Sequence, residues 1–260
     1  MSKLGKKKVI IITLTTLAAL ILCVVFVIVI KQLKYNHAME LKEKGEFREA
    51  YEVFEQLNGY KDSDAQMRDV TMEKGLLREC QVGDIIVFGD YNGNSTWIVL
   101  AKEDNKVLVL SEDCIIRRCY NAELTTTTWD NCSLRTWLNR AYFDSAFNTD
   151  EQAMIVETSI TNTIADEDNS PPQTEDEENL SDYVFLLSIE EVNQYLPDNS
   201  DKQGDYEGQI IWWWLRSPSM YFDNYAANVS IDGPVDEYGT YVTNGSGGVR
   251  PALWISINEL

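Results

Sequence analysis

The chain has 260 residues, of which 44% are hydrophobic, 11% aromatic and 25% charged, a composition that can bury the core of a globular domain. Its formal net charge of -20 argues against nucleic-acid binding, because phosphate recognition requires a basic surface. Lysines alone supply the charges ahead of the first acidic residue, Glu40, so the acidic excess belongs to the rest of the chain, which would attract cations or basic partners.

An apolar run without charges occupies residues 9–30. As a helix it would span roughly 33 Å, enough to cross the hydrocarbon core of a bilayer. The run ends directly on Lys31 without the small residues of a signal-peptidase site, which favours an anchor over a cleaved signal peptide. Lysines are denser before the run than after it, so residues 1–8 are expected in the cytoplasm. We therefore expect a single-pass protein of the cell membrane with an extracytoplasmic C-terminal domain.

Residues 34–80 are rich in helix-forming residues and form a predicted helical neck. Gly45 marks a break between two helices, and a third helix is expected to begin at Asp62 or Ser63. The positions that resemble a tetratricopeptide-type helix pair are Ala38, Gly45, Ala50 and Phe54. Such arrays normally need three or more repeats, and only about one and a half are present. The neck is interpreted as a spacer, with a partner-binding module as the alternative.

From residue 82 to residue 260 the pattern changes to β-strands with intervening helices. Three β-rich runs fill residues 84–113, with a hairpin turn at Asn92-Gly93 and a second turn at residues 103–105.

Helices are predicted in the middle of this domain. One covers residues 133–147 with Ser133 as its cap, a second begins at residues 149–152, and a third begins with the capping box of Ser188 and Glu191. The remaining chain reads as strands and turns.

Residues 162–182 are predicted to form an acidic, flexible loop. The segment contains Pro171 and Pro172 and a dense run of acids from Asp166 to Glu178. Clustered carboxylates raise the alternative of a calcium site, but their spacing matches no EF-hand loop. No other cofactor is indicated.

The sequence offers few residues for catalysis. The single histidine, His37, lies in the neck, which argues against Ser-His-Asp and Cys-His catalysis and histidine-bearing zinc sites in the main domain. Acidic pairs are plentiful, so a hydrolase that uses carboxylates stays open as a hypothesis. Exported cysteines can form disulfides. The candidate pair is Cys119 with Cys132, and buried free thiols are the alternative.

Five phrases occur in order between residues 82 and 260: VGDIIVFGDYNG, WDNCSLRTWLNRAYFDSAF, DYVFLLSIEEV, WWLRSP and GVRPALWI. Together they resemble an uncharacterised domain of exported, membrane-anchored bacterial proteins. The last two are also similar in style to the C-type-lectin-like fold and to formylglycine-generating enzymes. This implies an α+β domain with an irregular antiparallel sheet, flanking helices and a loop-rich ligand face. Those enzymes need a late cysteine pair, and no cysteine follows Cys132, so we expect a binding domain rather than an enzyme.

Three tryptophans stand side by side in IWWWLRSPS. Because side chains alternate along a strand, Trp212 and Trp214 share one face and Trp213 takes the other, which excludes a platform of three indoles. We interpret them, with Arg216 and Arg250, as structural support. The loops that follow mix aromatic and amide side chains, as recognition surfaces do. The candidate ligand contacts are Tyr221, Phe222, Asp223, Asn224, Tyr238, Tyr241 and Asn244.

The sequence therefore predicts a membrane-anchored extracytoplasmic module that binds a cell-surface glycan or protein through Tyr/Asn-rich loops. The first alternative is a structural or assembly protein whose helical neck recruits partners. The second alternative is a hydrolase that uses acidic residues.

Overall fold

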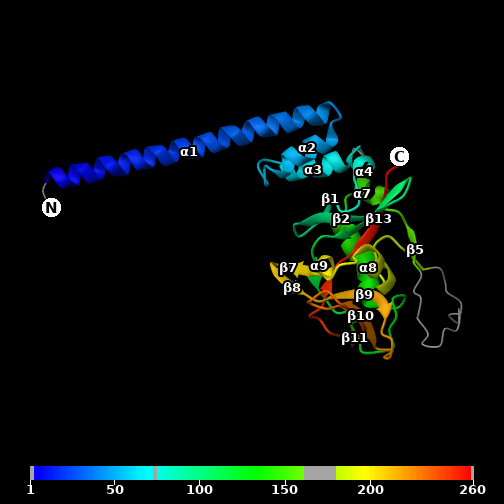
Figure 1. The fold of residues 1–260 in the computed structure, drawn as a ribbon. Helices are drawn as coiled ribbons and strands as arrows, with labels where there is room; N and C mark the ends of the chain where they lie inside the picture. The colour runs from blue at the N-terminus through cyan, green and yellow to red at the C-terminus, as the bar shows by residue number, and fades with distance from the viewer. Residues whose placement is uncertain (1–2, 73–74, 161–179, 259–260) are drawn as a thin grey trace. The chain divides into compact units, whose positions relative to one another are not determined.

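The computed structural model describes residues 3–72, 75–160 and 180–258. The chain divides into two compact units, Met1–Leu76 and Leu77–Leu260, each with its own internal contacts (Figure 1). The second unit begins five residues before the predicted domain start at residue 82.

The first unit is built on one long helix. Helix α1 (Lys3–Glu43) runs for 41 residues through both the apolar run and the first part of the neck. The predicted boundary between the two is therefore not a break in the helix, because residues 31–43 contain neither proline nor glycine. Within the described residues, one segment, Ala19–Glu43, has the length and hydropathy to cross a membrane. Such a helix fits either a membrane anchor or a signal sequence.

Two shorter helices follow, α2 (Phe47–Glu55), which packs on α1, and α3 (Ser63–Met72), which packs on α2. Gly45 has a φ of +77°, the left-handed conformation that ends many helices, so the predicted break is confirmed. The buried side chains of this unit include Ala38, Leu41, Ala50, Tyr51, Phe54, Leu57 and Val70. A short helix, α4 (Gly75–Glu79), follows.

The second unit contains a four-stranded antiparallel sheet. Its strands are, in spatial order, β1 (Ile85–Tyr91), β2 (Asn94–Lys102), β3 (Lys106–Ser111) and β13 (Ala252–Ser256). The turn between β1 and β2 has positive φ at both Asn92 and Gly93, as a type I′ hairpin requires. The predicted hairpin is thus confirmed.

A second, five-stranded sheet carries the tryptophans. Its strands are, in order, β11 (Val235–Tyr241), β10 (Tyr225–Val229), β9 (Trp213–Pro218), β12 (Gly248–Val249) and β4 (Ile116–Arg117). Every pairing is antiparallel except that of β12 with β9. Among the described residues two further antiparallel pairs occur: β5 (Thr158–Ile160) with β6 (Leu180–Asp182), and the hairpin of β7 (Gly204–Tyr206) with β8 (Gln209–Ile211).

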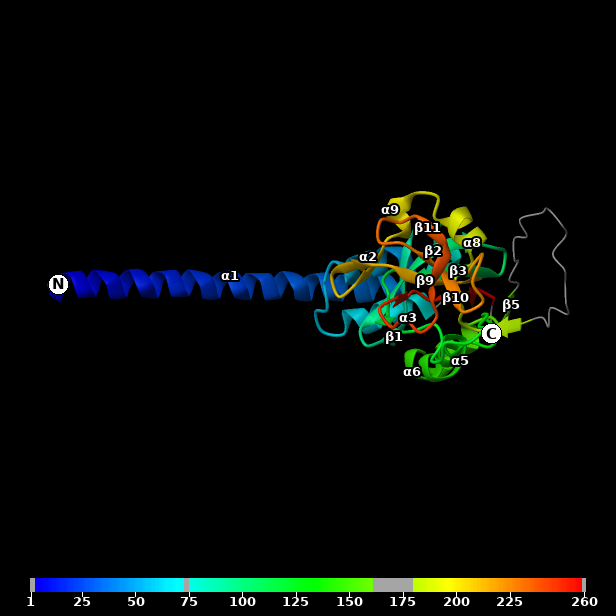
Figure 2. The same cartoon turned by 90° about the horizontal axis from the view of Figure 1, so that it is seen from below.

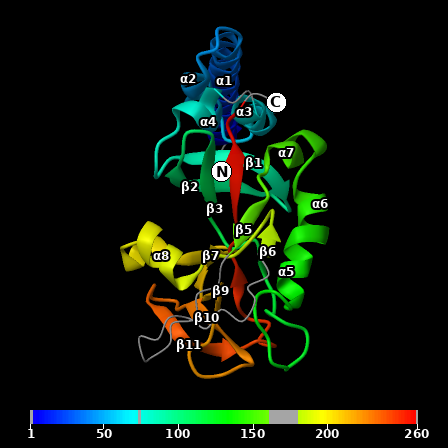
Figure 3. The same cartoon turned by 90° about the vertical axis from the view of Figure 1, so that its right-hand side faces the viewer.

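Short helices flank the sheets of the second unit. They are α5 (Ser133–Trp137), the π-helical turn η1 (Leu138–Tyr142), α6 (Phe143–Ala146), α7 (Thr149–Met154), α8 (Ile189–Tyr195) and α9 (Asn199–Lys202). Figures 2 and 3 show α5 and α6 along one side of the unit and α8 on the other.

The helix caps agree with the sequence at one site and differ at two. The capping box of Ser188 with Glu191 is confirmed at α8. Helix α5 is capped by Cys132 rather than Ser133, and α7 by Asn148 rather than a residue of 149–152. In each case the capping residue has an extended backbone, which lets its side chain accept a bond from an N–H two or three residues later.

The structure confirms a mixed α+β protein with an apolar N-terminal helix and a curled, mainly antiparallel sheet. The C-type-lectin-like fold and the tetratricopeptide-like neck stay predictions. Strand β6 occupies the last three residues of the predicted acidic loop, 162–182. The rest of that loop, with its calcium alternative, lies outside the described residues.

Candidate functional site

The tryptophan stretch forms part of the core. Trp213 and Trp214 are fully buried, and the ring of Trp212 meets that of Trp214 edge-on at 4.7 Å. The indole N–H of Trp213 donates to the carbonyl of Lys202 at 2.8 Å, and that of Trp214 to the carbonyl of Arg118 at 2.8 Å. The indoles are thus held by packing and backbone acceptors, and they present no common platform.

The two arginines beside this core are also buried. Arg216 donates to the carbonyl of Leu186 at 2.8 Å and forms a two-point ion pair with Glu191, in which Nη2 lies 2.9 Å from Oε1. Arg250 donates from Nε to the carbonyl of Ser111 at 2.9 Å and lies 5.3 Å from the ring centroid of Trp213. These contacts brace loops, as charge-assisted hydrogen bonds from buried guanidinium groups commonly do.

Four exposed aromatic rings gather on the loop between β9 and β10 and on strand β11. We call Tyr221, Phe222, Tyr238 and Tyr241 the aromatic face; their exposed fractions are 53%, 52%, 60% and 44%. Tyr221 and Tyr238 are stacked, with centroids 5.3 Å apart and planes 18° from parallel. Tyr225, which is not among the predicted ligand contacts, lies against both Phe222 and Tyr241 and so joins these two rings.

Backbone contacts fix the position of this loop. The hydroxyl of Ser219 donates to the carbonyl of Tyr238 at 2.7 Å, and the N–H of Met220 donates to the carbonyl of Glu237 at 3.0 Å. The pairing of β10 with β11 shifts register here, and Gly239 adopts a φ of +69° with its α-carbon against the carbonyl of Ala226. The rings therefore stand on an ordered frame.

Hydrogen bonds within the fold engage the side chains of Asp223 and Asn244 and the backbone of Asn224. Asp223 accepts from the hydroxyl of Thr126 at 2.7 Å, and the carbonyl of Asn224 accepts from Val242 N–H at 3.0 Å. The side-chain oxygen of Asn244 accepts from Ser246 within its own turn. The structure thus pairs Tyr221 with Tyr238 and links Phe222 to Tyr241 through Tyr225. The side chains of Asp223 and Asn244 bond to Thr126 and Ser246 instead.

A cavity of about 360 Å³ lies between the β1–β2 turn and the β7–β8 hairpin. Its polar lining includes Asn92, Asp113, Asp205 and Glu207. Burial, and then Glu112 and Asp205, raise the pKa of the Asp113 carboxyl. Sequence reasoning missed this cavity because its walls come from three distant segments. Among the described residues, no group of three or more His, Cys, Asp or Glu side chains is arranged to hold a metal ion.

The predicted disulfide between Cys119 and Cys132 is wrong for this structure, which has both as free thiols. The sulfur of Cys132 instead caps α5, accepting from the N–H of Arg135 at 3.3 Å, while its thiol donates to the carbonyl of Trp129. Burial raises the pKa of Cys132, and also that of Cys114, to about 12, so both stay protonated and are weak nucleophiles near neutral pH.

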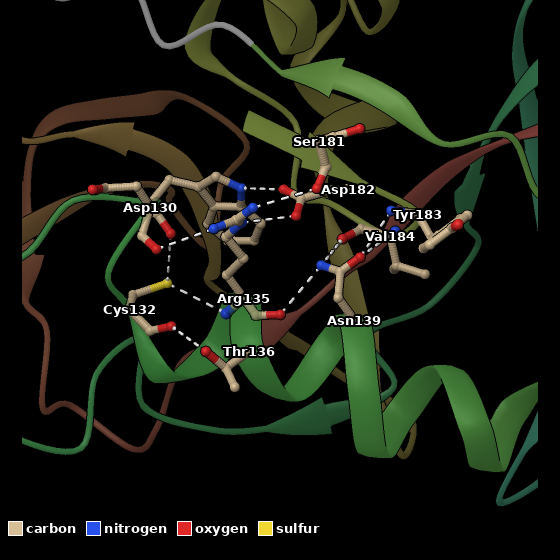
Figure 4. Close-up of polar contacts among 10 residues, drawn as sticks. Asp130, Cys132, Arg135, Thr136, Asn139, Ser181, Asp182, Tyr183 and Val184 are labelled. Carbon is tan, nitrogen blue, oxygen red and sulfur yellow. Dashed lines mark hydrogen bonds and ion pairs between the residues drawn. The ribbon is translucent and has the colours of Figure 1, made fainter. Parts of the chain in front are cut away.

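A polar cluster between α5 and residues 181–184 has a structural role (Figure 4). Asp182 accepts from the indole N–H of Trp129 at 2.8 Å and from Nε of Arg135 at 2.7 Å. Asn139 donates to the carbonyl of Val184 at 2.8 Å and accepts from two N–H groups of the same segment. The cluster ties residues 181–184 to the α5–η1 helix.

The geometry therefore defines an α+β domain whose exposed feature is an aromatic face on an ordered loop and an edge strand. Residues 104–257 match the family described as Domain of unknown function (DUF6273), and because this match covers more than half of the chain, the protein belongs to that family. The predicted resemblance to an uncharacterised domain is confirmed to this extent. No curated protein and no solved structure matches the chain, so the similarity to C-type lectins and formylglycine-generating enzymes stays a prediction.

Proposed function

We propose that this protein is a membrane-anchored binding module that holds a glycan against its aromatic face. One observation carries the proposal: four large rings, each about half exposed, lie on the β9–β10 loop and on strand β11, and hydrogen bonds from Ser219 and Met220 tie the loop to the strand. Exposed apolar patches are uncommon on soluble proteins and mark interaction sites, because covering them with a ligand removes apolar area from water.

A sugar fits the chemistry of this surface. The C–H face of a pyranose packs on an aromatic ring, and the nearby carboxylates of Asp223 and Glu237 can accept bonds from sugar hydroxyls. The chain is strongly acidic, so anionic polymers are repelled, which favours neutral or amino-bearing glycans. A protein ligand is the other outcome of the test below.

The location follows from the first unit. Helix α1 anchors the chain in the cell membrane, and the lysines before residue 9 keep that end in the cytoplasm. The binding domain then lies outside the membrane, on a C-type-lectin-like scaffold behind a tetratricopeptide-like neck.

The full chain in lipid nanodiscs should be screened against neutral, amino-bearing and anionic glycans. Replacing both stacked rings, Tyr221→Ala with Tyr238→Ala, should weaken binding at least about fivefold, since each aromatic contact contributes about 0.5–1.5 kcal/mol. Tyr183→Ala is the matched control, because Tyr183 is also an exposed tyrosine but packs on Phe143. Absence of glycan binding, or equal binding by the double variant and the control, would overturn the proposal.

A further inference from the structure

The turn between α2 and α3 lies beside α1 directly after the apolar run. Lys31 donates from Nζ to the carbonyl of Leu57 at 3.1 Å, and Lys34 donates to Oε1 of Gln56 at 2.9 Å. Further along the turn, the hydroxyl of Tyr60 donates to Oε1 of Gln32 at 3.3 Å. Residues 56–62 are therefore fastened to the part of α1 that follows residue 30.

Lysines and tyrosines alternate around this contact. Nζ of Lys61 lies 4.6 Å from the ring centroid of Tyr35 and 5.9 Å from that of Tyr60, while Nζ of Lys31 lies 5.7 Å from Tyr60. Together with Lys34, these five residues form what we call the collar. It concentrates three positive charges in a chain that is otherwise acidic.

Asp62 supplies one negative charge beside the three lysines, so these four side chains together carry a net charge of +2. Both oxygens of Asp62 accept bonds within the protein, one from the hydroxyl of Tyr35 at 2.6 Å and the other from Gln66 at 3.1 Å. Lys31 and Lys34 each donate one bond to the protein, and an ammonium group has three N–H donors. Donors thus stay available for another anion.

The collar lies at headgroup depth. At about 1.5 Å per helical residue, Lys31 to Tyr35 follow the end of the apolar run by roughly 2–8 Å. The headgroup region of each leaflet extends about 5–8 Å beyond the hydrocarbon core. Tyrosines and lysines are the residues that favour this zone, where lysine stems reach along apolar surface and their charges meet lipid phosphates.

From this placement we infer that the collar is a binding site for the phosphate groups of anionic membrane lipids. The inference rests on the proposed anchoring of α1 in the bilayer. Binding fixes the α2–α3 turn against the membrane surface, because Lys61 belongs to the turn while Lys31 and Lys34 belong to the anchor helix.

The test uses the full chain in nanodiscs of phosphatidylcholine alone or mixed with phosphatidylglycerol. Hydrogen–deuterium exchange of the amides of residues 56–62 should slow at least about threefold in the anionic nanodiscs, and added salt should reverse the effect. The double variant Lys34→Gln with Lys61→Gln should lose this lipid dependence.

The matched control is Lys42→Gln with Lys44→Gln. This variant also removes two positive charges, and its Lys42 bonds to Gln66 and Asp69 of α3. Both lysines lie more than ten residues beyond the apolar run. Exchange that is equal in both lipids, or a loss of lipid dependence that is the same in both double variants, overturns the collar site. Release of the chain from vesicles by alkaline carbonate overturns the anchoring itself, which separates the two failures.

Discussion

Removing the carboxylate of Asp182 should destabilise the second unit strongly. Its side chain is 1% exposed and accepts from two donors, the indole N–H of Trp129 and Nε of Arg135. In Asp182→Ala the indole N–H, which belongs to a fully buried ring, loses its acceptor. Arg135 also loses its ion pair but keeps contacts with the carbonyls of Asp130 and Ser181.

The expected loss is about 3–4 kcal/mol. An orphaned buried donor costs about 1–3 kcal/mol, and removing one partner of a buried ion pair costs about 3–5 kcal/mol. We use the lower part of the ion-pair range, because the Arg135 side chain is 21% exposed and water can hydrate it once Asp182 is removed. Burial raises the pKa of Asp182 despite Trp129 and Arg135, so desolvation outweighs the attraction on the carboxylate, and the predicted loss comes from the donors left without their acceptor.

Thermal unfolding of the full chain, followed by near-ultraviolet circular dichroism, checks this value. For a unit of this size the melting temperature should fall by roughly 6–16 °C. Glu103→Gln is the control, because Glu103 is 54% exposed in its pair with Lys106 and such a pair contributes less than about 1 kcal/mol. If Asp182→Ala lowers stability no more than Glu103→Gln does, the cluster is not the structural tie described above.

Three further predictions concern the same unit. Gly239→Ala should destabilise the second unit by more than Gly93→Ala does. Both glycines have positive φ, but only at Gly239 would a Cβ lie 2.1 Å from a carbonyl oxygen. The denaturant midpoints of the two variants test this, and equal midpoints would contradict it. Asp113→Asn should raise the melting temperature at pH 7, because the raised pKa makes the charged carboxylate unfavourable in the fold. This gain should shrink as pH falls through that pKa towards about 4, where the native carboxyl is also neutral; a gain independent of pH would refute the assignment. Iodoacetamide should label the half-buried Cys119 before the buried Cys132. The disulfide would instead be supported if the chain were two hydrogens lighter and both cysteines resisted labelling until they were reduced.

Features set by a few neighbouring residues could be predicted from the sequence. The turn at Asn92-Gly93, the break at Gly45 and the Ser188–Glu191 box each depend on backbone preferences or side-chain reach within four residues. The cap at Cys132 was missed because a thiol is an uncommon capping group, so its sulfur was considered for a disulfide instead.

Long-range contacts could not be predicted in the same way. The parallel pairing of β12 with β9 and the cavity beside Asp113 join segments separated by dozens of residues, which no local period encodes. The density of tyrosines indicated the aromatic face, whereas the local bonds of Asp223 and Asn244 follow from the tertiary fold.

The continuity of α1 has a mechanical consequence. From Lys31 to Glu43 the helix continues for about 20 Å past the apolar run without an interruption, and Gly45 supplies the joint that follows. If the apolar run lies in the bilayer as proposed, a tilt or rotation of that part of α1 also tilts or rotates its C-terminal part, on which α2 packs. Two glycines inserted after Lys31 would make the helix flexible at that point, so that the neck could move independently of the apolar run.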